Sequence, residues 1–179
     1  MSLLVTGLVI LTGLLVVGLV VWYVLPRRFR GSESVASAYD NWTQDQLLER
    51  LWGEHIHLGY YGDPPQGRDF RAAKQDFVDA LAQWGGLEGL PAGTKVLDVG
   101  CGIGGSSRRL ASRYGFDVLG VSISPGQVER AQQLTAPDLS CRFAVMDALK
   151  LDLPDACICL LYTSPSPRDA TLSRMPSSA

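Results

Sequence analysis

The sequence lacks a strong charge imbalance and has no long acidic or basic block in its interior. Its 16 Lys and Arg residues nearly offset 18 Asp and Glu residues, for a formal net charge of −2. Nucleic acid is therefore a poor candidate partner, because phosphate binding demands clustered Lys and Arg. The 179 residues are enough for one domain of ordinary size.

Cysteine and histidine are also scarce, and their spacing indicates neither a zinc site nor a disulfide framework. None of the four cysteines forms the C-x-x-C pairs of a zinc site, and a disulfide framework is not expected in this size class. Reduced thiols on the cytoplasmic side are the simpler interpretation. The two histidines, His55 and His57, alternate in a loop without a third ligand. We predict no metal and a structural role for this pair, or an effect on the shape of the substrate entrance.

Charge is absent altogether from residues 3–25. At about 1.5 Å per residue, a helix of this length spans a hydrocarbon core of about 30 Å. Trp22 and Tyr23 stand at its end, where aromatic rings prefer the membrane interface, and three arginines follow between positions 27 and 30. We therefore predict a single transmembrane anchor over residues 1–26.

The arginines predict that the rest of the chain lies on the cytoplasmic side, after a linker over residues 27–34. A cleaved signal peptide is the alternative, since Ala36-Ser37-Ala38 resembles a cleavage site. The apolar run is too long for that alternative, no basic residue precedes it, and the arginines separate it from the cleavage site.

The segment before residue 94 reads as helical, with one long loop. Residues 35–53 predict one or two short helices, and residues 54–67 predict a loop rich in aromatics, glycine and proline. Asp69 can cap a following helix. The apolar stripe predicted for the core side of that helix comprises Phe70, Ala73, Phe77, Leu81 and Trp84.

After Thr94 the pattern changes to alternating strands and helices, the signature of an α/β fold with a parallel sheet. Ser124-Pro125 is a strong helix start. Leu110 and Ala111 are expected to face inward, and Arg108, Arg109 and Arg113 to form a solvated face. The predicted elements are a strand at 95–99, a helix at 104–114, a strand at 116–121, a helix at 125–134 and a strand at 139–145.

A glycine-rich turn, KVLDVGCGIGGS, joins the first of these strands to its helix at residues 95–106. Glycines at 100, 102, 104 and 105 allow a tight turn and a close approach of the backbone to a ligand, which the helix amides then face. A dinucleotide fold would show G-x-G-x-x-G and an acidic residue at the end of the second strand. The second strand ends here in GVSIS, without a carboxylate, so a nicotinamide cofactor is disfavoured.

The turn VLDVGCGIGG resembles motif I of class I S-adenosylmethionine-dependent methyltransferases. Together with AYDNW, WGEHIHLGYYGD, VSISPGQVERA and FAVMDAL, it makes the chain similar to the cyanobacterial 2-methyl-6-phytyl-1,4-benzoquinol methyltransferases. That family is grouped with the tocopherol methyltransferases, and more distantly with cyclopropane synthases and sterol methyltransferases. The resemblance covers residues 35–155 and implies the N-terminal half of a Rossmann-like domain, with a helical cap before a β-α-β-α-β sheet.

The resemblance implies a site for S-adenosyl-L-methionine at three strand ends. The residues implied along its methionine part are Asp98, Gly100, Cys101 and Gly102. Those implied around the adenosine are Ser122, Ile123, Gln127, Asp147 and Ala148. The aromatic residues implied to close over the cofactor are Tyr39, Tyr60 and Tyr61. From the residues alone, Asp147 has the alternative of capping its own loop, and Cys101 reads as a small turn residue rather than a nucleophile.

Residues 156–179 have no periodicity apart from ICLLY, and we predict disorder for them. TSPSPRDATLSRMPSSA resembles translated sequencing-adapter read-through, so we expect a C-terminally truncated methyltransferase domain with an artefactual tail. The expected consequences are a first strand left at the sheet edge, poor solubility and no turnover.

The resemblance implies an intact protein that methylates a ring carbon of a prenylated benzoquinol in tocopherol and plastoquinone synthesis, held at a thylakoid or plasma membrane. The residues that act on the acceptor in this family lie mainly downstream, so no catalytic residue is assigned. Three alternatives stay open: another acceptor such as γ-tocopherol, a sterol or a lipid; a non-catalytic S-adenosylmethionine-binding protein; and a nicotinamide oxidoreductase.

Overall fold

The computed structural model describes residues 3–24, 32–44 and 46–163. The chain divides into two units, residues 1–31 and 32–179. Helix α1 (Leu3–Val24) lies in the first unit, and the side chains described in it are those of residues 7 and 10–19. No helix in the part of the chain that the structure describes is long and apolar enough to cross a membrane.

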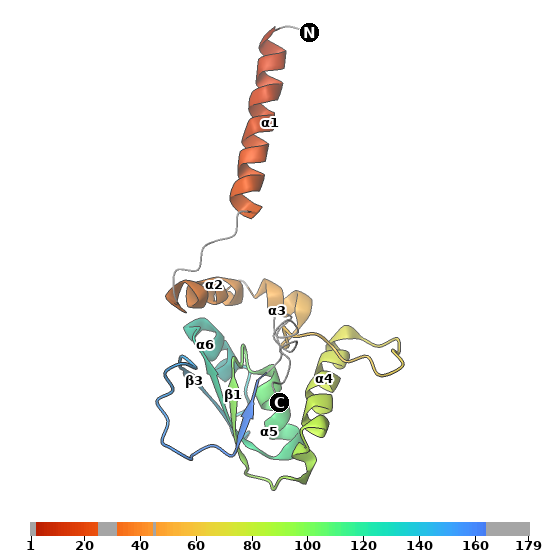
Figure 1. Ribbon diagram of the computed structural model, residues 1–179, viewed down its shortest axis with the longest axis vertical. Coiled ribbons are helices and arrows are strands. Elements are labelled where there is room, and N and C mark those ends of the chain that lie inside the picture. Colours follow the sequence, from red (N-terminus) through yellow and green to blue (C-terminus); the bar gives the residue numbers. More distant parts are fainter. Residues whose placement is uncertain (1–2, 25–31, 45, 164–179) are drawn as a thin grey trace, which may run out of the picture. The chain divides into compact units, whose positions relative to one another are not determined.

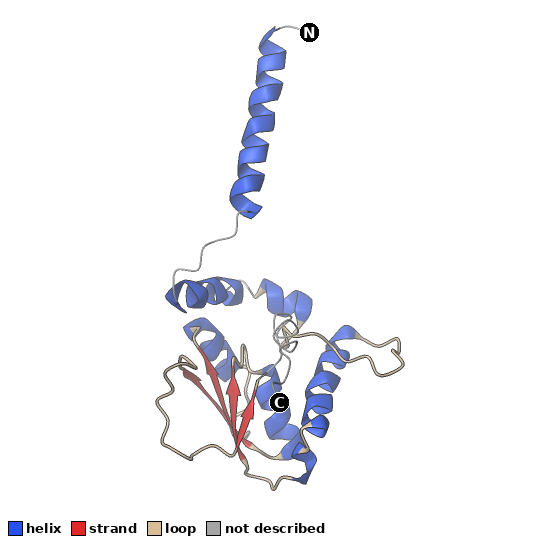
Figure 2. Cartoon of the chain, viewed as in Figure 1, coloured by secondary structure: helices blue, strands red, loops and turns tan. Residues whose placement is uncertain are grey.

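The second unit contains a parallel sheet in the order β3-β2-β1-β4 (Figures 1 and 2). All three neighbouring pairs are parallel, with Val96 opposite both Val118 and Leu160. The α/β class predicted from the sequence is confirmed. The strands are β1 (Lys95–Val99), β2 (Asp117–Ser122), β3 (Cys141–Val145) and β4 (Leu160–Tyr162).

The helices between these strands begin where the sequence predicts them. Helix α5 (Gly105–Tyr114) follows β1, and helix α6 (Pro125–Gln133) follows β2. Ser124 caps α6, since its hydroxyl accepts the Gln127 N–H at 3.1 Å. Leu110 is fully buried and Ala111 nearly so, as their spacing predicts.

Strand β4 corrects the predicted tail. Disorder was expected from residue 156, yet Leu160–Tyr162 pairs with β1, and the Tyr162 side chain is buried in the core. Strand β1 therefore lies between β2 and β4, and its predicted place at the sheet edge is wrong. The physical reason is that a strand with an unpaired ladder and apolar faces accepts a short apolar segment that comes within reach. The rest of the predicted tail, residues 164–179, lies outside the described residues.

The helices before the sheet are α2 (Ser32–Gln44), α3 (Leu47–Trp52) and α4 (Phe70–Trp84), and a short 3-10 helix, η1 (Leu87–Gly89), follows them. Figure 1 shows α2 and α3 at the end of the sheet toward which the strands point. Helix α4 packs against α5, and α2 packs against α6. The carboxyl ends of the strands are therefore covered by the first two helices of this unit.

The stripe predicted on α4 is only partly correct. Asp69 caps the helix as predicted, accepting the N–H groups of Arg71 and Ala72 at 3.0 Å each. Trp84, however, is 89% exposed, and Phe70 is also exposed. The buried positions of α4 are Ala73, Lys74, Val78 and Ala82. The predicted stripe is therefore shifted by about one position from the buried face of α4. The prediction missed this face because one of its buried positions is a lysine, Lys74.

Candidate cofactor site

A cavity of about 460 Å³ lies at the carboxyl ends of β1 and β2, lined also by residues of α2 and of the loop after α3. This volume is within the range of about 300–1,000 Å³ common for small-molecule sites. Ligands of open parallel sheets bind at such an edge. The predicted site residues that line it are Tyr39, Asp98, Gly100, Cys101, Gly102, Ser122, Ile123, Gln127 and Ala148.

The glycine turn forms the floor of this cavity because its backbone takes a conformation that favours glycine. Gly100, Gly102 and Gly104 all have positive φ, at 76°, 56° and 83°. The N–H groups of Gly100 and Cys101 both donate to the Val121 carbonyl, which ties the turn to β2. The turn is thus a rigid surface on which a ligand can approach the backbone closely.

The start of α5 faces the cavity without a side-chain cap. Its N-cap residue, Gly104, has no side chain to offer, whereas Asp69 and Ser124 cap α4 and α6. Gly105 and Ser106 of its first turn both line the cavity. Helix N-terminal amides without a cap attract a carboxylate or another anion. This opening suits an anionic ligand group beside the turn.

Asp98 lies beneath the turn with 1% of its surface exposed. It accepts a hydrogen bond from the Ser107 hydroxyl at 2.5 Å. Burial raises the pKa of this carboxyl to about 6, against the lowering effect of that hydrogen bond. A cationic ligand group beside Asp98 would favour its charged form.

Ser122 and Gln127 form a polar edge at the end of β2. The Ser122 hydroxyl donates to the Gln127 Oε1 atom at 2.8 Å and accepts the Ser124 N–H at 3.2 Å. This leaves the Gln127 Nε2 group as the remaining donor of a buried side chain that lines the cavity. A ligand hydroxyl or ring nitrogen can accept that hydrogen bond.

The helices before the sheet are fixed over this edge by charged contacts. Asp40 of α2 accepts hydrogen bonds from the Ser124 hydroxyl at 2.5 Å and from the Gly126 N–H at 2.9 Å. Glu49 of α3 pairs with Arg130 of α6 through two bonds, at 2.7 and 2.8 Å. Tyr39, one position before Asp40, is thereby held at the cavity.

Three predicted residues are not brought to the cavity lining. Asp147 accepts the Leu149 N–H at 2.9 Å, so it caps its own loop, the alternative that the sequence left open. Tyr60 and Tyr61 are about 40% exposed, and the Tyr60 N–H donates to the Ala73 carbonyl instead. Their predicted roles against a cofactor stay predictions.

One arginine lies in a different environment from the one predicted, and several cavity residues were not predicted. Arg108, predicted on a solvated face, is mostly buried: it donates to Glu54 at 2.6 Å and to the Ile103 carbonyl at 2.8 Å. It thereby links the glycine turn to the loop after α3. The cavity residues that the sequence did not single out for a ligand are Glu54, His55, Ile56, His57, Val99, Ile103, Ser106, Val121 and Met146.

Cys101 is consistent with its reading as a small turn residue. Burial, with Asp98 and Cys141 nearby, raises the pKa of its thiol well above the ordinary value. Such a thiol is protonated at physiological pH and is a poor nucleophile.

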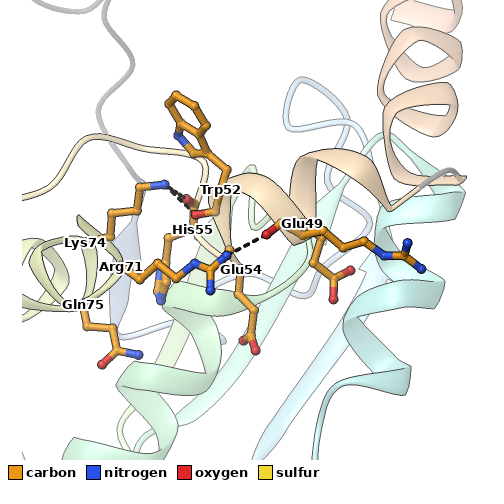
Figure 3. Close-up of a pocket in the computed structure, with 9 residues that line it drawn as sticks. Glu49, Trp52, Glu54, His55, Arg71, Lys74 and Gln75 are labelled. Atoms are coloured by element: carbon orange, nitrogen blue, oxygen red, sulfur yellow. Dashed lines mark hydrogen bonds between the residues drawn. The ribbon is translucent and has the colours of Figure 1, made fainter. Parts of the chain in front are cut away.

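A second pocket, of about 320 Å³, lies beside the first and shares Glu54 and His55 with it. Figure 3 shows Lys74 reaching the backbone carbonyls of Trp52 and His55 in this pocket. Arg71 donates likewise to the Arg50 carbonyl, so these two cations are engaged by the backbone and fix α3 and the loop after it.

The glycine turn, the parallel sheet and the cavity at its carboxyl edge form a Rossmann-like fold of the kind found in methyltransferases. Residues 96–176 match the family model described as a methyltransferase domain. A putative sarcosine dimethylglycine methyltransferase from Galdieria sulphuraria has the same fold, with a TM-score of 0.59 and 26% identity, over 70% of this chain and 48% of that one. The cyclase SpnF also shares it, with a TM-score of 0.60 and 28% identity, over 73% of this chain and 47% of that one.

Among curated proteins, the chain is 58% identical to 2-methyl-6-phytyl-1,4-hydroquinone methyltransferase of Synechocystis, over 83% of this chain and 46% of that protein. It is 35% identical to tocopherol O-methyltransferase of Arabidopsis thaliana, over 67% of this chain and 37% of that protein. The resemblance inferred from the sequence motifs is thereby confirmed. The chain spans less than half the length of these relatives.

Proposed function

We propose that this chain forms the S-adenosyl-L-methionine-binding part of a methyltransferase that acts on a ring carbon of a prenylated benzoquinol, of the 2-methyl-6-phytyl-1,4-benzoquinol type. Such a reaction belongs to tocopherol and plastoquinone biosynthesis. The observation that carries the proposal is the cavity above the glycine turn, in a chain 58% identical to an enzyme named for that hydroquinone.

The cavity residues fit the cofactor's charged and polar groups. Asp98 offers a carboxylate to its amino group, and the uncapped start of α5 offers N–H groups to its carboxylate. Ser122, Ile123 and Ala148 border the space for the adenosine, with Gln127 as the donor beside it. Tyr39 closes the cavity from α2. Gly100, Cys101 and Gly102 lie along the methionine part, where side chains larger than these would fill the space.

When bound, the cofactor supplies an electrophilic methyl group on its sulfonium. The residues of this chain would bind and orient that group, with α2 and the loop after α3 lining the cavity around it. Alignment of donor and acceptor, with help from a proton acceptor, is the main requirement of such a transfer.

The proposal includes a membrane anchor in the first unit and a catalytic part on the cytoplasmic side, at a thylakoid or plasma membrane. Its support is the sequence alone: residues 3–25 carry no charge, and three arginines follow between positions 27 and 30. A prenylated quinol partitions into lipid, so an enzyme held at the bilayer meets its substrate there.

A second candidate is a methyltransferase of the same fold that acts on γ-tocopherol. The similarity to tocopherol O-methyltransferases, at 35–36% identity, favours it over sterol or other lipid acceptors. A non-catalytic cofactor-binding protein is the third candidate.

A chimeric enzyme tests whether this segment supports methyl transfer to either acceptor. Residues 35–155 would replace the matching segment of the Synechocystis relative, and transfer of labelled methyl to 2-methyl-6-phytyl-1,4-benzoquinol and to γ-tocopherol would be compared. We expect methylation of the benzoquinol at a rate similar to the parent's, whereas the 179-residue chain alone should show no turnover. A chimera that binds the cofactor but methylates only γ-tocopherol would support the second candidate, and one that methylates neither would support the third.

A further inference from the structure

The two histidines form a hydrogen-bonded chain whose proton positions follow from their partners. His57 Nδ1 lies 2.8 Å from the Leu58 carbonyl oxygen, which can only accept, so Nδ1 carries a hydrogen. In a neutral imidazole, His57 Nε2 is then an acceptor. His55 Nδ1 lies 3.1 Å from it and must be the donor. Neutral His55 therefore has its lone pair on Nε2.

The surroundings hold this arrangement in place. Lys74 Nζ donates to the His55 carbonyl at 2.8 Å, as Figure 3 shows, and the His57 ring packs on Phe77 with centroids 5.2 Å apart. Gly105 leaves room for the His55 ring, since a Cβ there would lie 3.0 Å from two of its atoms. The loop is thus fixed on both sides of His55.

The hydrogen-bonded histidines belong to the lining of the cavity above the glycine turn. His55 and His57 both line the cavity together with Gly105 and Asp98. Within the described residues, His55 Nε2 has no hydrogen-bond partner, and it is not among the fully buried polar atoms that lack one. The buried His55 imidazole therefore keeps an open lone pair, in a residue that lines both this cavity and the second pocket.

On the basis of the proposed function, we propose that His55 Nε2 accepts the hydroxyl hydrogen of the quinol ring, and that His57 is a positioning residue that fixes the His55 tautomer. The hydroxyl hydrogen bond raises electron density on the ring carbon that is methylated. As the new carbon–carbon bond forms and the sulfur–methyl bond breaks with its electron pair on sulfur, the hydroxyl proton passes to Nε2 and its oxygen becomes a ring carbonyl. That proton returns to the oxygen when the ring carbon loses its hydrogen as a proton to water.

The charges around His55 agree with a neutral acceptor. Burial, together with His57 and the nearby charges of Arg108, Lys74 and Arg109, lowers the pKa of His55 to about 4. Burial also lowers the pKa of His57. The acidic groups of the same region are engaged, with Glu54 paired to Arg108 and Asp98 bonded to Ser107. The imidazole is therefore neutral at physiological pH, and it holds a proton only during transfer.

Nitrogen NMR on the full chain in detergent micelles tests the proposal, because the sequence holds only two histidines. Spectra of chain labelled with 15N-histidine would be recorded with and without S-adenosylhomocysteine. We expect protonated Nδ1 and bare Nε2 on both rings at neutral pH. Methylhydroquinone at saturation, with S-adenosylhomocysteine present, should shift His55 Nε2 toward the position of a hydrogen-bonded nitrogen and leave His57 Nδ1 unchanged.

Two matched variants separate the roles. His55→Asn keeps a donor at the Nδ1 position and removes Nε2, so methylhydroquinone should bind about tenfold more weakly. His57→Asn keeps the donor to Leu58 and removes the acceptor for His55, so His55 should become a mixture of tautomers. Trp84→Phe, at an exposed site, serves as the control and should behave as the parent.

A protonated His55 Nε2 in the parent, or an Nε2 resonance that methylhydroquinone leaves unmoved, overturns the proposal. Neither result touches the proposed function, whose own failure would be the absence of S-adenosylhomocysteine binding in a calorimetric titration of the same sample.

Discussion

Replacement of Gly105 by alanine tests how closely the loop after α3 is packed on the glycine turn. A Cβ at this position would lie 2.7 Å from the Glu54 carbonyl oxygen and 3.0 Å from two atoms of the His55 ring. Optimal contacts between such atoms are about 3.5–4.0 Å. The loop cannot retreat freely, because Lys74 holds the His55 carbonyl and Arg108 holds the Glu54 side chain.

Two effects of this substitution oppose each other. Overpacking of a closely packed site costs about 1–3 kcal/mol. Alanine is the better helix former by up to about 1 kcal/mol, and less in a first turn, so packing decides the sign. We expect a net loss of about 1–2 kcal/mol in the free energy of unfolding, which corresponds to a fall in Tm of roughly 2–8 °C.

Thermal unfolding followed by circular dichroism measures this loss, with Gly67→Ala as the control. A Cβ at Gly67 meets nothing within 4 Å, so that variant should unfold within about 0.5 kcal/mol of the parent. The histidine spectra of Gly105→Ala should also change, because the clash displaces the His55 ring. A Gly105→Ala chain as stable as the parent would refute the contact geometry on which the site and the histidine chain depend.

Three further predictions concern the contacts that hold the cap and the buried charges. Asp40→Ala removes both hydrogen bonds from α2 to the start of α6 and should lower the free energy of unfolding in urea by about 1–2 kcal/mol. Asp40→Asn keeps an acceptor and should lose less stability. Equal losses in the two variants would contradict this prediction. Arg130→Ala breaks the partly exposed pair with Glu49 and should cost about 0.5–1 kcal/mol, decreasing in high salt; an effect insensitive to salt would argue against it. Asp98 binds its proton more tightly in the folded state, so its contribution to stability is present below pH 4 and is lost as the pH rises through about 6. His55 binds its proton less tightly in the folded state, so its contribution is present above pH 6.5 and is lost as the pH falls toward about 4. Urea midpoints between pH 4 and 6.5 should therefore rise more steeply with pH in Asp98→Asn than in the parent and fall with pH in His55→Asn, and identical slopes would show that these shifts are absent.

Local sequence signals were enough to predict the strands, helices and turns that surround the cavity. The glycine turn, the Ser124-Pro125 helix start and the Asp69 cap each depend on neighbouring residues, and each is found where it was predicted. The same holds for the inward face of α5. These features placed most of the predicted cofactor residues around one cavity.

The features that the sequence did not reveal depend on distant partners. Arg108 leaves the solvent because Glu54 lies opposite it, although the two are 54 residues apart. Strand β4 has only three residues and becomes a strand because β1 offers it an unpaired ladder. The histidine chain depends on a loop conformation that Lys74 fixes from α4. No pattern within a short window encodes these partnerships.

The central claim is that the cavity above the glycine turn binds S-adenosyl-L-methionine, and calorimetric titration of the 179-residue chain in detergent tests it most directly. The account predicts saturable binding at one site, with a Kd of about 1–100 µM, and no heat from NADH under the same conditions. Asp98→Ala should weaken that binding by at least about tenfold, while Trp84→Phe leaves it unchanged. Absence of S-adenosyl-L-methionine binding by the folded chain, or binding of NADH in its place, would contradict the account.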